Sequence, residues 1–173
     1  MTKLETTTHI ALLSLAAIAG YLMLEQRFAP QAPKQLTRGD LEQSLQSTSL
    51  TIPKAGWGDH ERTLALQISA TCPFCVANEP FYKTLVKTRD GSSRTKEKIG
   101  IVVLTADDEE ELRMHLKSAG IVVDKIIQVN PETTGTAATP VVFYVDPKGQ
   151  VQRAFVGRLD DTQQTQVLQL LNL

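Results

Sequence analysis

Cys72 and Cys75, three positions apart, are the residues of this chain best suited to covalent chemistry. The 173-residue sequence has no other cysteine, and a random placement would give this spacing only about once in a hundred. Two thiols on one turn of a helix can close into a disulfide, or open into an attacking thiolate and a second thiol that resolves the mixed disulfide. The spacing therefore predicts thiol–disulfide exchange.

The residues around this pair predict a junction between a strand and a helix. Residues 63–68 alternate polar and apolar side chains, as in a strand with one face in a core, and the residues after Cys72 read as a helix. Pro73 suits the first helical position, where its missing N–H would have no partner anyway. The unpaired N–H groups and the positive end of the helix dipole favour a thiolate at Cys72.

Two other interpretations of the pair are weaker. A structural disulfide that closes so short a loop would restrict the unfolded chain little. A zinc site would need a second pair of ligands, and the three histidines, His9, His60 and His115, show no ligand spacing. We therefore expect no metal, and no cofactor other than the redox pair Cys72–Cys75.

The motif Cys72-Pro73-Phe74-Cys75, with Pro80 after it and Thr139-Pro140 before a later apolar strand, resembles the thioredoxin superfamily. Within that superfamily the sequence is similar to the TlpA-like, membrane-tethered branch, which includes cytochrome c maturation thioredoxins. The resemblance covers residues 50–173. It implies a three-layer α/β fold, a central mixed sheet flanked by helices, with an extra strand-helix insertion between the cysteines and Thr139.

The resemblance also implies how the site is assembled. Pro140 would be cis and would face the cysteines. Pro73, Phe74, Thr139 and Pro140 would then line a groove, in which an extended client peptide pairs with the Thr139 backbone.

Several positions depart from the pattern of this family. Thr71 replaces the tryptophan that often precedes the first cysteine, and Leu66 replaces a buried aspartate. Asn78 stands where TlpA-like reductases often have a glutamate, and the acid here is Glu79, about 100° further round the helix. If Glu79 is half-buried near Cys75 it is a candidate proton acceptor; if it is exposed, it is ordinary helix charge.

The amino-terminal residues contain an uncharged apolar run, residues 10–24. As a helix these fifteen residues would span about 22 Å, so that flanking residues are needed to cross a hydrocarbon core of about 30 Å. A cleaved signal peptide and an uncleaved signal anchor compete, with a buried core helix as the third choice. The prolines in residues 29–33 suit cleavage poorly, so we prefer an anchor.

We expect three parts: an anchor at residues 1–28, a linker with a short helix at residues 29–50, and a thioredoxin-like domain at residues 51–173. The charges that flank the apolar run do not fix its orientation, and if anything argue against a cytoplasmic start. Because a cytosolic thioredoxin needs no leader, we place the protein in the bacterial cytoplasmic membrane as a single-pass protein, its catalytic domain facing the periplasm.

The function predicted is reduction of disulfides in extracytoplasmic client proteins, with re-reduction by a membrane electron donor. A net charge of −1 argues against a general nucleic-acid binder. Two alternatives stay open: a tethered module that binds clients without turnover, and a peroxiredoxin-like peroxidase.

The rest of the chain reads as regular elements around this site. Residues 107–111 place acidic side chains where a helix begins, so they predict a cap rather than a metal site. Trp57, between two glycines, is expected to anchor a turn. The other predictions are a short helix near 41–45, an edge strand at 49–52, a helix end and exposed loop at 83–98, a buried strand at 99–104, one or two short strand pieces at 121–123 and 126–129, a hairpin of 141–145 and 151–156, and a closing helix at 160–171.

Overall fold

The computed structural model describes residues 18–21 and 37–171. The chain divides into two units, Met1–Gln35 and Leu36–Leu173. In the first unit only a helical turn at 18–21 is described, so most of the predicted anchor lies outside the described residues. Within the two described ranges, no helix has both the length and the apolar character needed to cross a bilayer. The membrane anchor stays a prediction.

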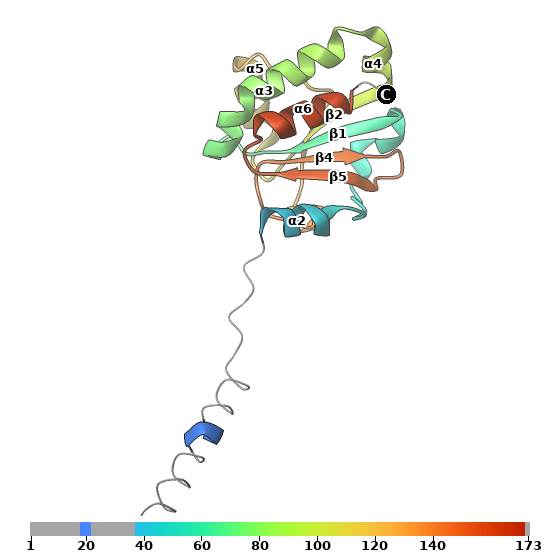
Figure 1. Cartoon of the computed structure of the whole chain (residues 1–173). Helices are drawn as coiled ribbons and strands as arrows, with labels where there is room; N and C mark the ends of the chain where they lie inside the picture. Colours follow the sequence, from blue (N-terminus) through green and yellow to red (C-terminus); the bar gives the residue numbers. More distant parts are fainter. Residues whose placement is uncertain (1–17, 22–36, 172–173) are drawn as a thin grey trace, which may run out of the picture. The chain divides into compact units, whose positions relative to one another are not determined.

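The second unit is built on a five-stranded mixed sheet with the strand order β3-β2-β1-β4-β5 (Figure 1). Strands β1, β2 and β3 run parallel, whereas β4 runs antiparallel to β1, and β5 antiparallel to β4. The strands are β1 (Arg62–Gln67), β2 (Ile99–Thr105), β3 (Lys125–Gln128), β4 (Val141–Val145) and β5 (Val151–Val156). The fold class is therefore α/β, as predicted.

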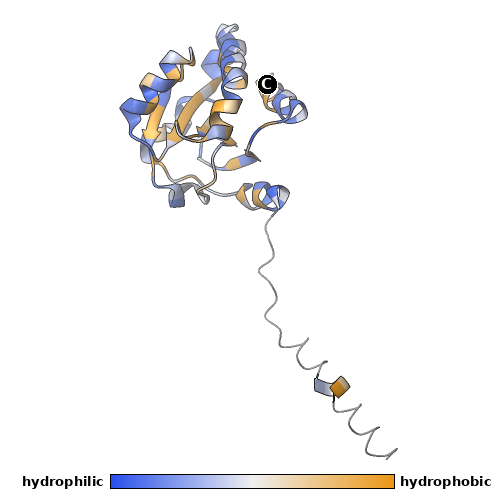
Figure 2. Cartoon of the chain, turned by 90° about the vertical axis from the view of Figure 1, so that its left-hand side faces the viewer, coloured by the Kyte–Doolittle hydropathy of each residue, from blue (hydrophilic) through white to orange (hydrophobic). Residues whose placement is uncertain are grey.

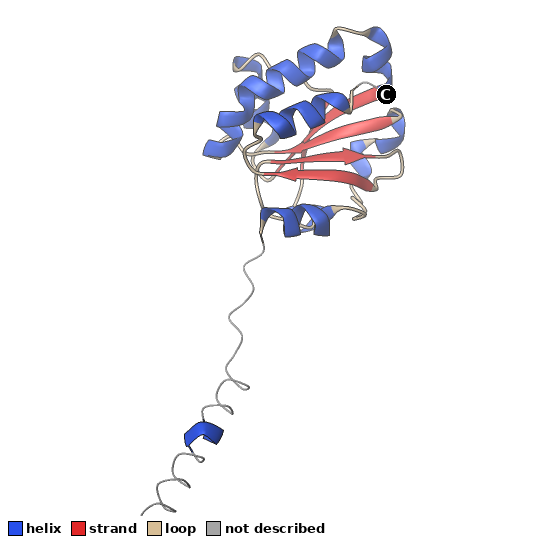
Figure 3. Cartoon of the chain, viewed as in Figure 1, coloured by secondary structure: helices blue, strands red, loops and turns tan. Residues whose placement is uncertain are grey.

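Helical layers cover both faces of the sheet (Figure 3). One face packs against α3 (Pro73–Asp90), α5 (Glu109–Ser118) and α6 (Asp161–Gln169). The other face packs against α2 (Arg38–Leu45) and two short 3₁₀ turns, Pro53–Ala55 and Trp57–Asp59. The β2-α5-β3 segment is a parallel crossover that adds β3 to the sheet beside β2, in the region where a strand-helix insertion was predicted.

The central strand β1 is buried on both faces, which corrects the prediction of one buried face. Its side chains alternate between the two cores, with Leu64 and Leu66 on the α3 side and Ala65 on the α2 side. Even the polar residues Thr63 and Gln67 are buried. A strand with neighbours on both edges and helices on both faces has no solvent side, and Figure 2 shows the apolar colour concentrated on the strands.

The segment that begins near residue 36 belongs to the same unit as the sheet. The Glu42 side chain of α2 accepts a hydrogen bond from the Val156 N–H at 2.9 Å, at the end of β5. Trp57 is buried and donates from Nε1 to the Leu50 carbonyl oxygen at 2.8 Å. The first contact fixes α2 onto the sheet, whereas the second closes the segment from Leu50 to Trp57 on itself, so Trp57 anchors its turn as predicted.

Three predicted elements differ in detail from the structure. In residues 83–98 the predicted helix end is present, because α3 extends to Asp90, but most of the predicted loop is a second helix, α4 (Ser93–Lys98), which Ser92 caps. Residues 49–52 form no strand, only an isolated bridge between Ser49 and Gln150. Of the one or two strand pieces predicted at 121–123 and 126–129, only the second is a strand, β3. Residues 121–123 lie in the loop after α5, where the Ile121 N–H donates to the Leu116 carbonyl oxygen and Ile121 enters the core.

A buried ion pair holds the far end of α3 to the sheet. Arg89 is buried, and its guanidinium pairs with Asp90 and with Asp124 in the loop before β3. Asp124 also accepts the Ile101 N–H of β2 at 2.7 Å. A single carboxylate thus satisfies a buried charge and a strand donor together.

We predict that Asp124→Ala destabilises the fold by about 3 kcal/mol, because it leaves the Arg89 charge and the Ile101 N–H without this partner. The free energy of unfolding, from urea denaturation followed by circular dichroism, measures this loss. Glu109→Ala, which breaks the exposed pair with Arg113, serves as a control and should cost less than about 1 kcal/mol. Equal losses in the two variants would contradict the prediction.

Candidate active site

The pairing of strands brings together three segments that are far apart in the sequence. They meet at one edge of the sheet, where β1 and β5 end and β4 begins. Gln67, the last residue of β1, lies opposite Val141, the first of β4, and Val141 in turn lies opposite Val156 of β5. The loop that leads to Cys72, the Thr139-Pro140 segment and the loop after β5 therefore meet at this edge. They form the candidate active site.

Cys72 is the residue that caps the amino terminus of α3. Its backbone is extended, Pro73 takes the first helical position as predicted, and the Cys75 N–H donates to the Cys72 sulfur at 3.3 Å. Cys72 is partly exposed, whereas Cys75, in the first turn of α3, has only 3% of its surface exposed. The Cys72 sulfur is thus accessible to a partner molecule, whereas the Cys75 sulfur is shielded from solvent.

The two thiols differ in acidity. Partial burial tends to raise the pKa of Cys72, but hydrogen bonds with the side chains of Cys75 and Thr139, and from the backbone N–H groups of Cys75 and Phe74, outweigh it and lower that pKa. Burial, with the adjacent Cys72, raises the pKa of Cys75 to about 12. Cys72 is therefore the thiol that ionises first.

Thr139-Pro140 lies beside Cys72, and its peptide bond is cis, as the resemblance implied. The Cys72 thiol donates to the Thr139 carbonyl oxygen at 3.4 Å. Phe74, between the two cysteines, is 58% exposed, and Pro73 is also exposed. The structure thus brings together Cys72, Cys75 and Thr139, while the peptide groove along them stays a prediction.

Two side chains that the sequence did not single out hold the loops of the site. Gln67 is buried, and its Nε2 donates to the carbonyl oxygens of Thr136 (2.8 Å) and Ala138 (2.9 Å), just before Thr139. Asp107 accepts the Ala70 N–H at 2.8 Å, just before Cys72. In the sequence, only the polar side chain of Gln67 at the end of an apolar strand indicates its role. The acidic residues 107–111 predict a helix cap, and within them Asp108 caps α5, whereas Asp107 supports the loop before Cys72.

Asn78 and Glu79, one turn beyond Cys75, point to different neighbours. Asn78 is buried; it accepts the Leu159 N–H at 3.2 Å and donates to the Gly157 carbonyl oxygen at 3.4 Å. Glu79 is half-buried, and its carboxylate lies 2.6 Å from Nε2 of His115 on α5. Within the described part of the chain, neither side chain forms a hydrogen bond with a cysteine.

No protein-family model and no curated protein matches the sequence. Solved structures do match. A thiol:disulfide interchange protein of the thioredoxin family from Chlorobium tepidum aligns with a TM-score of 0.52 at 18% identity, over 68% of this chain and 83% of its own. The chain has a thioredoxin fold. The predicted thioredoxin-like fold is thereby confirmed.

Two further structures agree with this assignment. A thiol:disulfide interchange protein from a Bacteroides species aligns with a TM-score of 0.52 at 17% identity, over 69% of this chain and 78% of its own. A thiol-disulfide isomerase from Corynebacterium glutamicum also gives 0.52, at 14% identity, over 72% of this chain and 90% of its own.

The difference in acidity predicts selective alkylation of the reduced protein. Because the thiolate is the reacting form, the rate at Cys72 should rise with pH through a midpoint below about 8.5, the value of an ordinary cysteine. Cys75 should stay nearly unreactive at neutral pH. Iodoacetamide labelling at a series of pH values, with the two sites separated by mass spectrometry in Cys72→Ser and Cys75→Ser variants, measures both. Similar midpoints for the two thiols would refute the assignment.

Proposed function

We propose that this protein is a thiol–disulfide oxidoreductase in which Cys72 attacks and Cys75 resolves. The observation that carries the proposal is the partly exposed Cys72 sulfur, which receives the Cys75 N–H at the start of α3, with the buried Cys75 thiol directly behind it. An exposed thiolate beside a protected second thiol is the arrangement that exchange chemistry needs.

The reaction proceeds in two displacements. The Cys72 thiolate attacks one sulfur of a client disulfide; a mixed disulfide forms, and the other client sulfur leaves as a thiolate that takes up a proton. Cys75 then loses its proton and attacks the Cys72 sulfur, which releases the second client thiol. The client gains two electrons and two protons, and the protein is left with a Cys72–Cys75 disulfide.

The second step requires that Cys75 become easier to ionise. Burial raises the pKa of Cys75 first, and the neighbouring Cys72 thiolate raises it further. In the mixed disulfide Cys72 carries no charge, so the second effect disappears at the moment when Cys75 must react. Glu79, half-buried one helical turn away, is our candidate to accept the proton, and His115 holds its carboxylate in place.

The direction that we propose is reduction of extracytoplasmic clients. The names of the similar solved structures describe thiol:disulfide interchange proteins, which supports exchange chemistry in general. The apolar run at residues 10–24 supports a membrane-anchored protein with this domain in the periplasm. A dithiol outside the cytoplasm becomes oxidised unless it is supplied with electrons, so re-reduction by a membrane electron donor is part of the proposal.

We predict that Cys75→Ser traps client proteins as mixed disulfides through Cys72, because the resolving thiol is missing. Non-reducing electrophoresis of extracts should show these adducts, and Cys72→Ser, the matched control, should show none. Glu79→Gln should also accumulate adducts if Glu79 takes the proton of Cys75, whereas Glu97→Gln on α4 should not. Clients bound without any covalent adduct would favour the tethered binding module instead.

We further predict a reduction potential for the Cys72–Cys75 couple near or below about −250 mV, the range of reductants. Equilibration of the protein with dithiothreitol or glutathione mixtures, read out by alkylation, measures it. A value above about −150 mV would indicate an oxidase or isomerase and would overturn the proposed direction. If the Cys72–Cys75 pair did not equilibrate with dithiothreitol or glutathione, the enzymatic proposal as a whole would be wrong.

A further inference from the structure

The loop after β5 is the third segment at the active-site edge, and exchange chemistry itself makes no use of it. The Gly157 N–H donates to the Pro140 carbonyl oxygen at 2.7 Å, and Asn78 of α3 bonds both Gly157 and Leu159. The residue between these two anchored positions is Arg158. Its backbone is therefore fixed between Pro140 and the first turns of α3.

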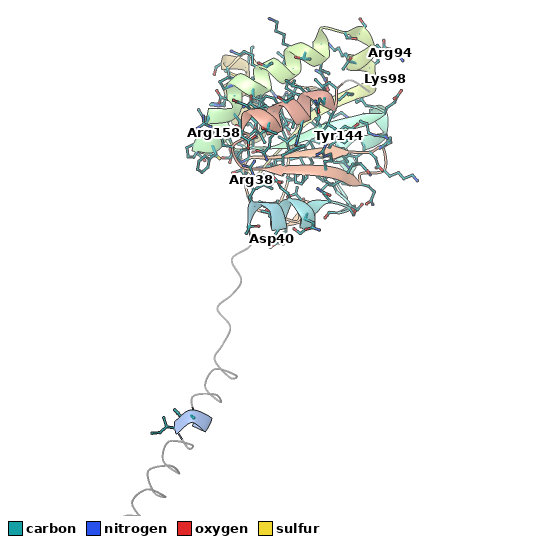
Figure 4. The ribbon with its side chains drawn as sticks, in the orientation of Figure 1. Arg38, Asp40, Arg94, Lys98, Tyr144 and Arg158 are labelled. Atoms are coloured by element: carbon teal, nitrogen blue, oxygen red, sulfur yellow. The ribbon has the colours of Figure 1, made fainter. Side chains whose placement is uncertain are left out.

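The Arg158 side chain is exposed at this place. Leu159, its neighbour, is buried in the core, whereas Arg158 points outward. Figure 4 shows Arg158 at the end of the domain where α3 begins, and Arg94 at the opposite end, on α4. Within residues 18–21 and 37–171 the guanidinium of Arg158 has no hydrogen bond or ion pair.

Phe74 lies on the same side of α3 as this loop. Residues four apart on a helix share a face, so Phe74 lies one turn before Asn78, the residue that bonds the 157–159 loop. Phe74 is one of the few large apolar side chains exposed in the described part of the chain, at 58%. An apolar ring and an unpaired positive charge thus lie on one side of the reactive sulfur.

The nearby acidic groups do not neutralise this charge by direct contact. The Asp160 carboxylate accepts the Gln163 N–H and caps α6, and the Glu79 carboxylate is held by His115 on α5. The groups that lower the pKa of Cys72 are its own neighbours, and Arg158 is not among them. The charge is therefore available to a molecule that approaches Cys72 from outside.

We propose that Arg158 and Phe74 form a docking surface that selects client segments with an acidic side chain and an apolar side chain next to the disulfide. The inference rests on the proposed function, because the client is the polypeptide whose disulfide Cys72 attacks. Phe74 would cover the apolar side chain, and the Arg158 guanidinium would pair with the carboxylate at the rim of the contact. Such a rim charge acts mainly on the encounter of the two molecules.

The test compares two disulfide peptides that differ only in whether glutamate or lysine flanks the cysteine. One exposed ion pair changes a rate or affinity by about two- to fivefold, so the full chain should reduce the glutamate peptide about threefold faster in terms of kcat/KM. Arg158→Glu should invert this preference. Arg94→Glu, the same charge change at the other end of the domain, should keep the wild-type ratio, and raising the salt concentration should shrink it.

The same peptides with serine in place of cysteine measure docking without reaction, by fluorescence anisotropy of a labelled peptide. This readout scores the charge preference even if the proposed reduction fails, so the two proposals are separable. An unchanged ratio in Arg158→Glu, with the fold intact by circular dichroism, would overturn the inference. An equal change in Arg94→Glu would overturn it too, because the effect would then come from net charge alone.

Discussion

The antiparallel pairing of β1 with β4, in which Gln67 lies opposite Val141, is the contact on which the candidate active site depends. β1 leads to Cys72, and β4 follows Thr139-Pro140, so this register brings the Cys72 sulfur close to the Thr139 carbonyl oxygen. A slip of one residue would turn every side chain of a strand to the opposite face. Because both faces of β1 are packed against helices, such a slip is strongly disfavoured.

Side-chain hydrogen bonds hold the loops that follow or precede these strands in fixed positions. Gln67 reaches from the end of β1 to the backbone that precedes Thr139, and Asp107 holds the backbone that precedes Cys72. Asn78 fixes the loop after β5 against α3. Each of the three segments at the site is thus held by a side chain from another segment: Gln67 lies at the end of β1, Asn78 on α3, and Asp107 in the bend between β2 and α5.

The surroundings of the cysteines are largely apolar. Leu66 lies in the core where the family pattern has an aspartate, and Asn78 is neutral where a glutamate is common. Burial, together with the adjacent Cys72, raises the pKa of Cys75 to about 12, so the Cys75 thiol is protonated at neutral pH. The positive charge of Arg158, in contrast, is exposed to solvent.

The sequence alone determined the features that depend on short-range physics. The cysteine spacing, the proline at the first helical position and the alternation of apolar residues predicted the strand, the helix and the reactive thiol, because caps and helical turns involve residues only a few positions apart. The cis Thr139-Pro140 bond was expected from family resemblance. Only the tertiary structure decided which groups meet across long distances: that Gln67 supports the Thr139 segment, that Glu79 pairs with His115, and that Arg158 lies beside the site. These contacts arise from strand register and helix packing, and no local pattern encodes a partner dozens of residues away.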